Sequence, residues 1–266
     1  SPALRAIANW PVPPVDWRVH RCYFNPGESQ PFAPECTPAR RPGIARVLLW
    51  GDSHAADLYP GLLKLQKRHN FDVIQWTAAS CPPTREALPV EGRGCAERRA
   101  WALGEMTAAP PETVLLAGAW ELYLARDSSE KEILGVTRDA IRYLKQVGVR
   151  HIIVFGPGPT WNTSLPTDLF RYMRLGHTLP IRFGSVAADV RRLDAAMAAE
   201  VAASGGQFVS ILDLLCNLHG CRVQGEEGRE PPDLLFWDRD HLTQSGSRWL
   251  MDAAAPLMFA GEPAGF

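Results

Sequence analysis

The sequence predicts an α/β protein of three layers, with helices on both faces of a five-stranded parallel sheet and a proline-rich N-terminal extension. After residue 45, short apolar runs alternate with amphipathic stretches, which is the pattern of βαβ units. The runs are almost continuously apolar, as expected for strands that are covered on both faces. The chain of 266 residues, 46% of them hydrophobic, is long enough for one large domain or two small ones.

The first 45 residues form the predicted extension, which contains nine of the 23 prolines and shows neither helical nor strand periodicity. It also contains Trp10, Trp17, Tyr23 and Phe24. Because large aromatic side chains are usually buried in folded proteins, we expect the extension to pack on the domain formed by residues 46–266.

The elements of that domain follow in order along the chain. The five expected strands lie at 47–50, 73–76, 114–117, 151–155 and 208–212. Helical patterns occupy about 55–68, 95–107, 130–146, 186–203 and 245–258. The aromatic segment 157–184 interrupts the alternation, and it is typical of a binding loop or of a structural cover.

Composition narrows the possible functions. The formal net charge is -1, without the excess of positive charge that is typical of nucleic-acid-binding proteins, so no nucleic-acid partner is expected. Gly, Pro or a charged residue interrupts every hydrophobic run before it reaches the roughly 18 residues of a membrane span. The sequence does not open with a signal peptide, so we expect a mature form or a segment of a longer protein.

The six cysteines fall into three pairs that are close in sequence: Cys22 with Cys36, Cys81 with Cys95, and Cys216 with Cys221. Proximity favours these three disulfides among the possible connectivities. Zinc binding is the alternative, although the close C-x2-C pairs of zinc sites are missing. Disulfides would indicate an oxidising compartment, either secreted or periplasmic.

The segment 50–54, Trp-Gly-Asp-Ser-His, begins at the last residue of the first expected strand. Ser53 should therefore lie at the carboxyl edge of the sheet beside a helix N-terminus, where α/β proteins bind their ligands. The helix dipole and its free N–H groups would stabilise an oxyanion there. The alternative is that Asp52 and Ser53 only cap the helix.

The segment 236–242, Phe-Trp-Asp-Arg-Asp-His-Leu, precedes the last expected helix. A serine nucleophile needs a base, and His241 is of the usual type. Asp238, three residues earlier, can reach back to the other imidazole nitrogen and fix its tautomer, whereas we expect the adjacent Asp240 to point away. The alternative is a solvated acidic loop with a capping histidine, and it is weaker once Ser53 is considered.

These segments resemble the first and last blocks of the SGNH/GDSL hydrolase superfamily, Gly-Asp-Ser-His at 51–54 and Asp-x-x-His at 238–241. With Ser-Cys-Pro-Pro at 80–83 and the cysteine pairs, the chain resembles in particular the periplasmic SGNH domain fused to acyltransferase-3 membrane proteins. The resemblance covers about residues 46–257. It implies the flavodoxin-like SGNH fold, with Ser53 as nucleophile, His241 as base and Asp238 as its partner.

The resemblance also implies an oxyanion hole, but two of its usual residues are missing. The block that normally supplies a glycine reads Thr-Ala-Ala-Ser-Cys at 77–81, and Trp120 stands where an asparagine is expected. The expected donors are therefore the N–H of Ser53 and a backbone N–H from Ala79 or Ser80, since a main-chain donor does not require glycine.

Three further residues are candidates for substrate contact: Trp120, His54 and Trp161 from the aromatic segment. Trp120 could stack on a sugar, and His54 could touch the acyl group or the acceptor. For each of them packing is the alternative. We expect no metal and no cofactor bound by this domain.

The resemblance implies an O-acyltransferase, most simply an O-acetyltransferase, that modifies a bacterial surface polysaccharide such as lipopolysaccharide O-antigen through an acyl-serine. The acyl group would come from acetyl-CoA through an acyltransferase-3 membrane domain in the same full-length chain, which would tether this domain to the periplasmic side of the inner membrane. A carbohydrate acetyl esterase, with water as acceptor, is the alternative. A metallophosphoesterase lacks its later metal ligands here, and a silent carbohydrate-binding domain would not need Ser53, Asp238 and His241.

Overall fold

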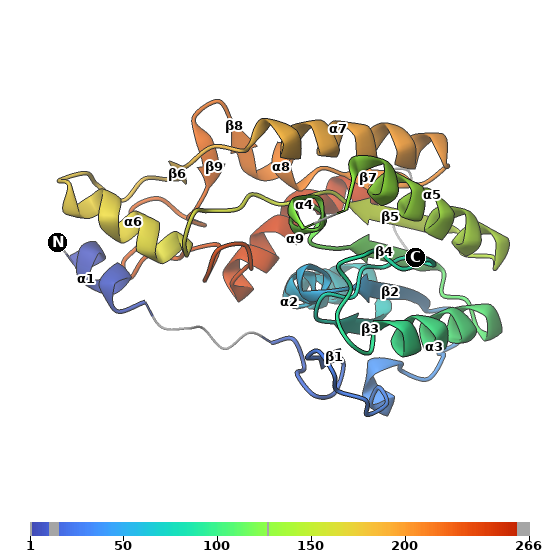
Figure 1. The fold of residues 1–266 in the computed structure, drawn as a ribbon. Coiled ribbons are helices and arrows are strands. Elements are labelled where there is room, and N and C mark those ends of the chain that lie inside the picture. Colours follow the sequence, from blue (N-terminus) through green and yellow to red (C-terminus); the bar gives the residue numbers. More distant parts are fainter. Residues whose placement is uncertain (1, 11–15, 127, 260–266) are drawn as a thin grey trace.

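The structure, a computed structural model, describes residues 2–10, 16–126 and 128–259. Figure 1 shows a central parallel sheet with strand order β1-β3-β2-β4-β5-β7. Its strands are β1 (Tyr23–Phe24), β2 (Ala45–Gly51), β3 (Phe71–Ala78), β4 (Thr113–Ala117), β5 (His151–Phe155) and β7 (Gln207–Val209).

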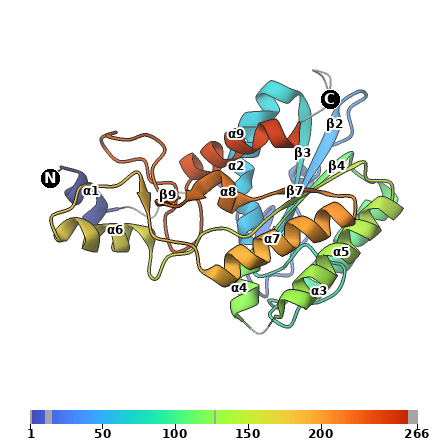
Figure 2. The ribbon, with the colours of Figure 1, turned by 90° about the horizontal axis from the view of Figure 1, so that it is seen from above.

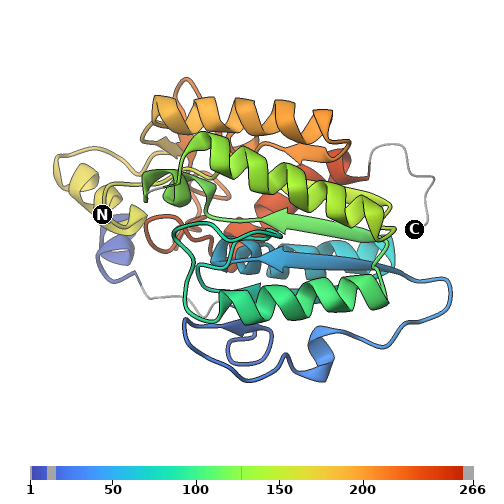
Figure 3. The same cartoon turned by 45° about the vertical axis from the view of Figure 1, so that its right-hand side comes forward.

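The predicted three-layer arrangement is confirmed. One face of the sheet is covered by α3 (Cys95–Ala108), α5 (Glu130–Gln146) and α7 (Ala188–Ala203), which lie in front of the strands in Figure 3. The other face is covered by α2 (Ser53–His69) and α9 (Gln244–Met258), and Figure 2 shows the two helix layers on opposite sides. Each layer buries its own apolar cluster against the sheet.

The sheet has six strands rather than the expected five. The additional strand, β1, comes from the extension and pairs with the end of β3, Tyr23 opposite Thr77 and Phe24 opposite Ala78. Two residues are too few for a periodic pattern, so this strand could not be predicted from periodicity. The last expected strand is also shorter, because Ser210 accepts the N–H of Asp213 and caps α8 (Ile211–Leu215).

The aromatic segment 157–184 is folded. It contains α6 (Leu165–Arg174), whose cap Ser164 accepts the N–H of Thr167, and β6 (Arg182–Phe183). β6 joins β8 (Cys216–Asn217) and β9 (Gly220–Arg222) in a small antiparallel sheet. The first helix of the chain, α1 (Pro2–Ala8), packs on α6 at one end of the molecule (Figure 1), and the short α4 (Trp120–Ala125) follows β4.

All three predicted disulfides are confirmed: Cys22–Cys36, Cys81–Cys95 and Cys216–Cys221. The first lies inside the extension, next to η1 (Pro34–Cys36), and the second ties the start of α3 to the loop after β3. Within the described ranges, no helix is both long and apolar enough to cross a lipid bilayer.

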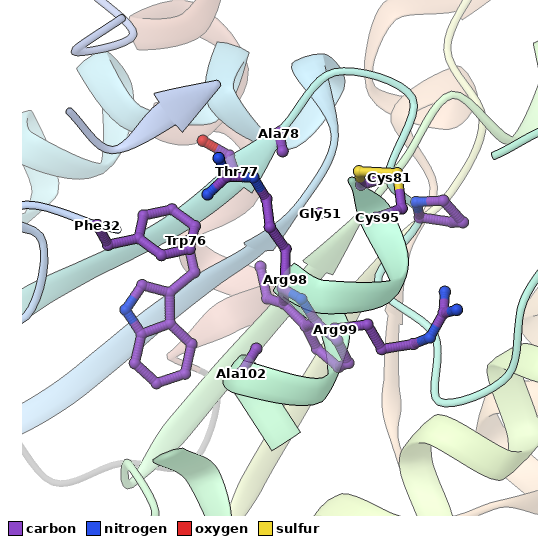
Figure 4. A pocket seen from close by; sticks show the side chains of 12 residues that line it. Phe32, Gly51, Trp76, Thr77, Ala78, Cys81, Cys95, Arg98, Arg99 and Ala102 are labelled. Carbon is purple, nitrogen blue, oxygen red and sulfur yellow. A yellow bond between two sulfur atoms is a disulfide. The ribbon is translucent and has the colours of Figure 1, made fainter. Parts of the chain in front are cut away.

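The extension is fastened to β3 and α3 around a small pocket. The Arg98 guanidinium lies 3.7 Å from the centroid of the Phe24 ring, and it donates a hydrogen bond to the carbonyl of Glu28 at 2.7 Å. Figure 4 shows Arg98 between two aromatic side chains, Phe32 and Trp76, and the Cys81–Cys95 disulfide. This pocket is lined by none of the three predicted catalytic residues, so we interpret it as the junction that holds the extension in place.

Candidate active site

The turn between β2 and α2 places the candidate nucleophile. Gly51 has φ +153°, and a Cβ on it would lie 1.9 Å from the carbonyl oxygen of Ala117, so only glycine fits. Asp52 caps α2: its Oδ1 accepts the N–H of His54 at 2.8 Å, while its Oδ2 accepts the N–H of Ala119 at 2.8 Å. The cap role expected as an alternative for Asp52 is thus present, and it leaves Ser53 at the first turn of the helix with its hydroxyl free for another partner.

That partner is a histidine 188 residues away. His241 Nε2 lies 2.9 Å from Ser53 Oγ, and His241 Nδ1 lies 2.8 Å from Asp238 Oδ2. The other oxygen of Asp238, Oδ1, accepts the main-chain N–H groups of Asp240 at 3.0 Å and of His241 at 2.8 Å. The structure therefore brings Ser53, His241 and Asp238 together in the geometry through which an imidazole takes a proton from a serine hydroxyl.

The expectation that Asp240 points away is wrong. Its Oδ1 lies 3.0 Å from His241 Nδ1, and the residue is buried. The reason is the tight loop: because Asp238 holds two consecutive N–H groups, the chain curls around the imidazole and presents both carboxylates to the same nitrogen. His241 thus has a second carboxylate within ion-pair distance of Nδ1, beside the predicted one that accepts its hydrogen bond.

The carboxylates around His241 change its protonation. Burial disfavours the imidazolium, but the hydrogen bond that His241 donates to Asp238 and the charges of Asp57, Asp238 and Asp240 outweigh burial and raise the pKa of His241 to about 9. Burial likewise opposes the charge of Asp238, but the hydrogen bond to His241 outweighs it, so the pKa of Asp238 is lowered. The form of His241 that accepts a proton therefore becomes abundant only as the pH approaches 9.

His54 packs beneath the triad. It is buried, its Nδ1 lies 3.6 Å from Glu121 Oε1, and its ring stands edge-on to that of His241 with centroids 5.2 Å apart. Burial raises the pKa of Glu121 to about 7, and Glu121 Oε2 accepts the N–H of Gly158 at 3.3 Å. Glu121 was not predicted from the sequence. Its only signal is its place four residues after the end of a buried strand.

Of the expected oxyanion donors, Ala79 is excluded. Its N–H donates to the carbonyl of Phe24 at 2.8 Å, because β1 continues its pairing with β3 by one further residue. Ser80 follows with φ +55°, in the left-handed region. The N–H groups of Ser53 and Ser80 stay the candidate donors.

Two expected substrate contacts lie inside the protein. Trp120 is 1% exposed and its indole N–H donates to the carbonyl of Phe155 at 2.9 Å, while Trp161 is 6% exposed and packs on Phe236 with ring centroids 4.4 Å apart. Neither indole presents a face to a sugar, so the packing alternative explains both.

Two other tryptophans flank the catalytic histidine instead. The Trp237 ring is stacked on that of His241 at 18° with centroids 5.6 Å apart, and the Trp17 ring lies 5.3 Å from it at 58°. Trp237 could have been found from the sequence, since it precedes Asp238 in the last block. Trp17 lies in the extension, where no pattern indicated it.

A surface pocket of about 370 Å³ opens beside Asp238. Its lining comes from α1, α6 and the last block: Ile7, Ala8, Trp10, Ser164, Pro166, Thr167, Phe170, Trp237 and Asp238. The described walls are aromatic and aliphatic with two hydroxyls, and Asp238 is the only charged residue among these described residues.

Among the described residues, three potential metal ligands come within 4.8 Å of one another: His54, Asp240 and His241. Both nitrogens of His241 already have partners, Asp238 and Ser53, so a cation would have to displace the triad's own contacts. We interpret the group as part of the catalytic site, and the absence of a metal from the reaction stays a prediction.

With this geometry in place, the family can be stated. A sequence model described as SGNH domain (fused to AT3 domains) matches residues 21–256. The chain belongs to this family. A comparison with curated proteins gives no match.

Solved structures share the SGNH fold. The periplasmic domain of a lipopolysaccharide acetyltransferase from Salmonella ser. Paratyphi A is 23% identical, with a TM-score of 0.69 over 81% of this chain and 84% of that one. A G-D-S-L family protein from Desulfitobacterium hafniense DCB-2 is 10% identical, with a TM-score of 0.51 over 80% of this chain and 99% of that one. The three disulfides of this SGNH domain fit a location outside the cytoplasm.

Proposed function

We propose that this SGNH domain transfers an acetyl group to a hydroxyl of a bacterial surface polysaccharide through an acetyl-serine intermediate on Ser53. The observation that carries the proposal is the hydrogen-bonded series from Ser53 Oγ through His241 to Asp238, in a chain whose family is fused to AT3 domains. Lipopolysaccharide O-antigen is the acceptor we propose, by analogy with the acetyltransferase domain that shares the fold.

The residues perform two matched half-reactions. In the first, His241 Nε2 takes the proton of Ser53 as Oγ attacks the carbonyl carbon of the acyl donor, and Asp238 stabilises the imidazolium that forms. The negative oxygen lies at the N-terminus of α2, where the N–H of Ser53 can donate to it. The proton then passes from His241 to the leaving group, and the acetyl group stays on Oγ.

In the second half-reaction, an acceptor hydroxyl enters. His241 takes its proton, the hydroxyl oxygen attacks the acetyl carbon, and the bond to Ser53 Oγ breaks as His241 returns the proton to that oxygen. The products are an acetylated sugar and free Ser53. If water takes the place of the sugar, the same steps give acetate, which is the esterase alternative.

The pocket beside Asp238 is where we propose that the acceptor lies. Indole faces at Trp10 and Trp237 suit the apolar faces of a sugar ring, and the hydroxyls of Ser164 and Thr167 suit its polar edge. A phosphate-bearing donor would need cationic side chains, and the part of this lining that the structure describes has none. We propose that the acyl group, derived from acetyl-CoA, is instead delivered by a linked AT3 membrane domain, with this domain on the periplasmic side.

The test uses an activated acetyl ester such as 4-nitrophenyl acetate. Wild-type protein should gain the mass of one acetyl group after acid quenching, and Ser53→Ala should neither gain it nor turn over. Ser29→Ala, at an exposed serine, is the control and should match wild type. Turnover unchanged in Ser53→Ala would overturn the proposal.

A second assay separates transfer from hydrolysis. With purified O-antigen polysaccharide in the reaction, transfer predicts acetylated polysaccharide formed at the expense of acetate. Acetate alone at saturating polysaccharide would favour the esterase.

A further inference from the structure

A buried carboxylate on α2, Asp57, lies behind the catalytic histidine and has no part in the proposed chemistry. It is 2% exposed. Its Oδ2 accepts the N–H of Leu242, the residue after His241, at 2.9 Å, and its Oδ1 accepts the indole N–H of Trp17 at 3.1 Å. One side chain thus connects the main chain of the catalytic loop to the N-terminal extension.

Trp17 is itself held in place from two sides. Besides its bond to Asp57, its carbonyl accepts a hydrogen bond from the side-chain amide of Gln75 on β3 at 3.0 Å, and its ring packs on Tyr23 with centroids 4.8 Å apart. It is 8% exposed, and its ring lies 5.3 Å from that of His241. With Trp237 stacked on the same imidazole, the histidine has an indole on each of two sides.

We infer that Trp17 and Asp57 are a positioning pair, through which the N-terminal extension holds His241 in its catalytic orientation. The inference rests on the proposed function, because the pair acts only through His241. Asp57 fixes the backbone immediately after the histidine, and Trp17 restricts the ring. A triad tolerates little displacement, since a shift of about 1 Å at a reacting group can cost about 100-fold in rate.

The pair also acts on the charge of the histidine. Asp238 and Asp240 face His241 from its own loop, and His54 and Asp57 face it from α2. Burial raises the pKa of Asp57 to about 7, with the charge of His241 opposing the rise. Without the indole donor, the carboxylate form of Asp57 loses a hydrogen bond and its pKa rises further. His241 then loses part of a negative neighbour, so its own pKa falls.

The experiment compares Trp17→Phe, which keeps a ring and removes the N–H, with Asp57→Asn, which keeps the shape but removes the charge and can accept only one of the two N–H groups. Trp76→Phe is the matched control, because Trp76 also donates a buried indole N–H to the extension, at Thr37 Oγ1 (2.8 Å), but lies at the junction in Figure 4. For each variant, kcat and KM for the activated acetyl ester are measured across pH, with thermal unfolding recorded in parallel.

We expect Trp17→Phe to lower the plateau kcat by about 10-fold with KM little changed, and to move the acidic limb of the profile to lower pH. Asp57→Asn should move the limb in the same direction by about one pH unit. The double variant should lose less than the product of the two single losses, because the two residues share the hydrogen bond between Trp17 Nε1 and Asp57 Oδ1. Trp76→Phe should keep the wild-type plateau and limb even where its unfolding temperature falls.

If Asp57→Asn leaves both the plateau kcat and the acidic limb of the pH profile unchanged, the inference is overturned. The same holds if Trp76→Phe lowers the plateau and moves the limb as Trp17→Phe does. The extension would then have a purely stabilising role. Asp57→Asn carries the test by itself if Trp17→Phe does not fold. The outcome is distinguishable from failure of the proposed function, because that failure would appear as turnover in Ser53→Ala.

Discussion

The hydrogen bonds of the two Asp238 oxygens predict that asparagine and alanine at this position have different effects on catalysis. Oδ1 accepts two main-chain N–H groups, at 2.8 and 3.0 Å, so in Asp238→Asn the amide oxygen should keep this place and turn the NH2 group toward His241 Nδ1. An NH2 group there donates, which leaves Nδ1 without its proton and puts the proton on Nε2, facing Ser53. The base is then blocked.

The size of the loss in kcat depends on which group remains to accept a hydrogen bond from His241 Nδ1. The wrong tautomer costs about 10⁴ in kcat in a serine-protease triad, or ~5.4 kcal/mol, and we expect a similar loss in Asp238→Asn. Asp238→Ala donates nothing and leaves Asp240 Oδ1 at 3.0 Å from Nδ1, so the correct tautomer survives. We expect a loss of only about 100-fold, or ~2.7 kcal/mol. Asp240→Asn should cost less than about 10-fold, since Asp238 is still present.

The assay is kcat/KM for the activated acetyl ester, with thermal unfolding recorded for each variant. The order of loss should be Asp238→Asn, then Asp238→Ala, then Asp240→Asn. An equal loss of kcat/KM in Asp238→Ala and Asp238→Asn would refute the reasoning, because it would show that Asp240 cannot accept the hydrogen bond of His241 Nδ1. Equal losses at 238 and 240 would show that the two carboxylates share the role.

Three further predictions concern the whole site. The value of kcat/KM should rise about 50-fold between pH 7 and pH 9, because deprotonation of His241, with its raised pKa of about 9, supplies the base; a profile already flat at pH 7 would contradict this. Incubation with a metal chelator should leave turnover unchanged, and a loss of activity would return His54 and Asp240 to consideration as ligands. Titration of denatured, unreduced protein should find about no free thiols, whereas reactive thiols would contradict the three disulfides.

The triad could be predicted because its signals are local. An apolar run ending in Gly-Asp-Ser-His fixes Ser53 at the carboxyl edge of the sheet, and an aspartate three residues before a histidine can reach its ring within one turn. The disulfides follow from proximity in the same way. The strands of the sheet that came from continuous apolar runs were also found, β7 only in part.

What could not be predicted depends on contacts between distant segments. β1 exists only because Phe24 and its neighbour meet the end of β3, and Ala79 loses its N–H to that pairing. In the sequence, Asp57 is indistinguishable from an ordinary acidic residue of a helix, because its partner Trp17 lies 40 residues away along the chain. The sequence does not show whether the indole of Trp120 is buried or exposed, because tryptophan occurs both in hydrophobic cores and at sites where it stacks on a sugar ring.

The position of the extension has a consequence for self-association. The extension runs along the outer side of β3. Arg41 forms an ion pair with Asp72 near the start of β3 (2.6 Å), and β1 pairs with the end of β3. β3 is eight residues long and buried throughout. An uncovered strand of this length and apolarity presents unpaired N–H and C=O groups on which a second copy can add its own strand. A chain shortened to begin at residue 46 would carry such an open edge, and we expect it to aggregate where the longer chain does not.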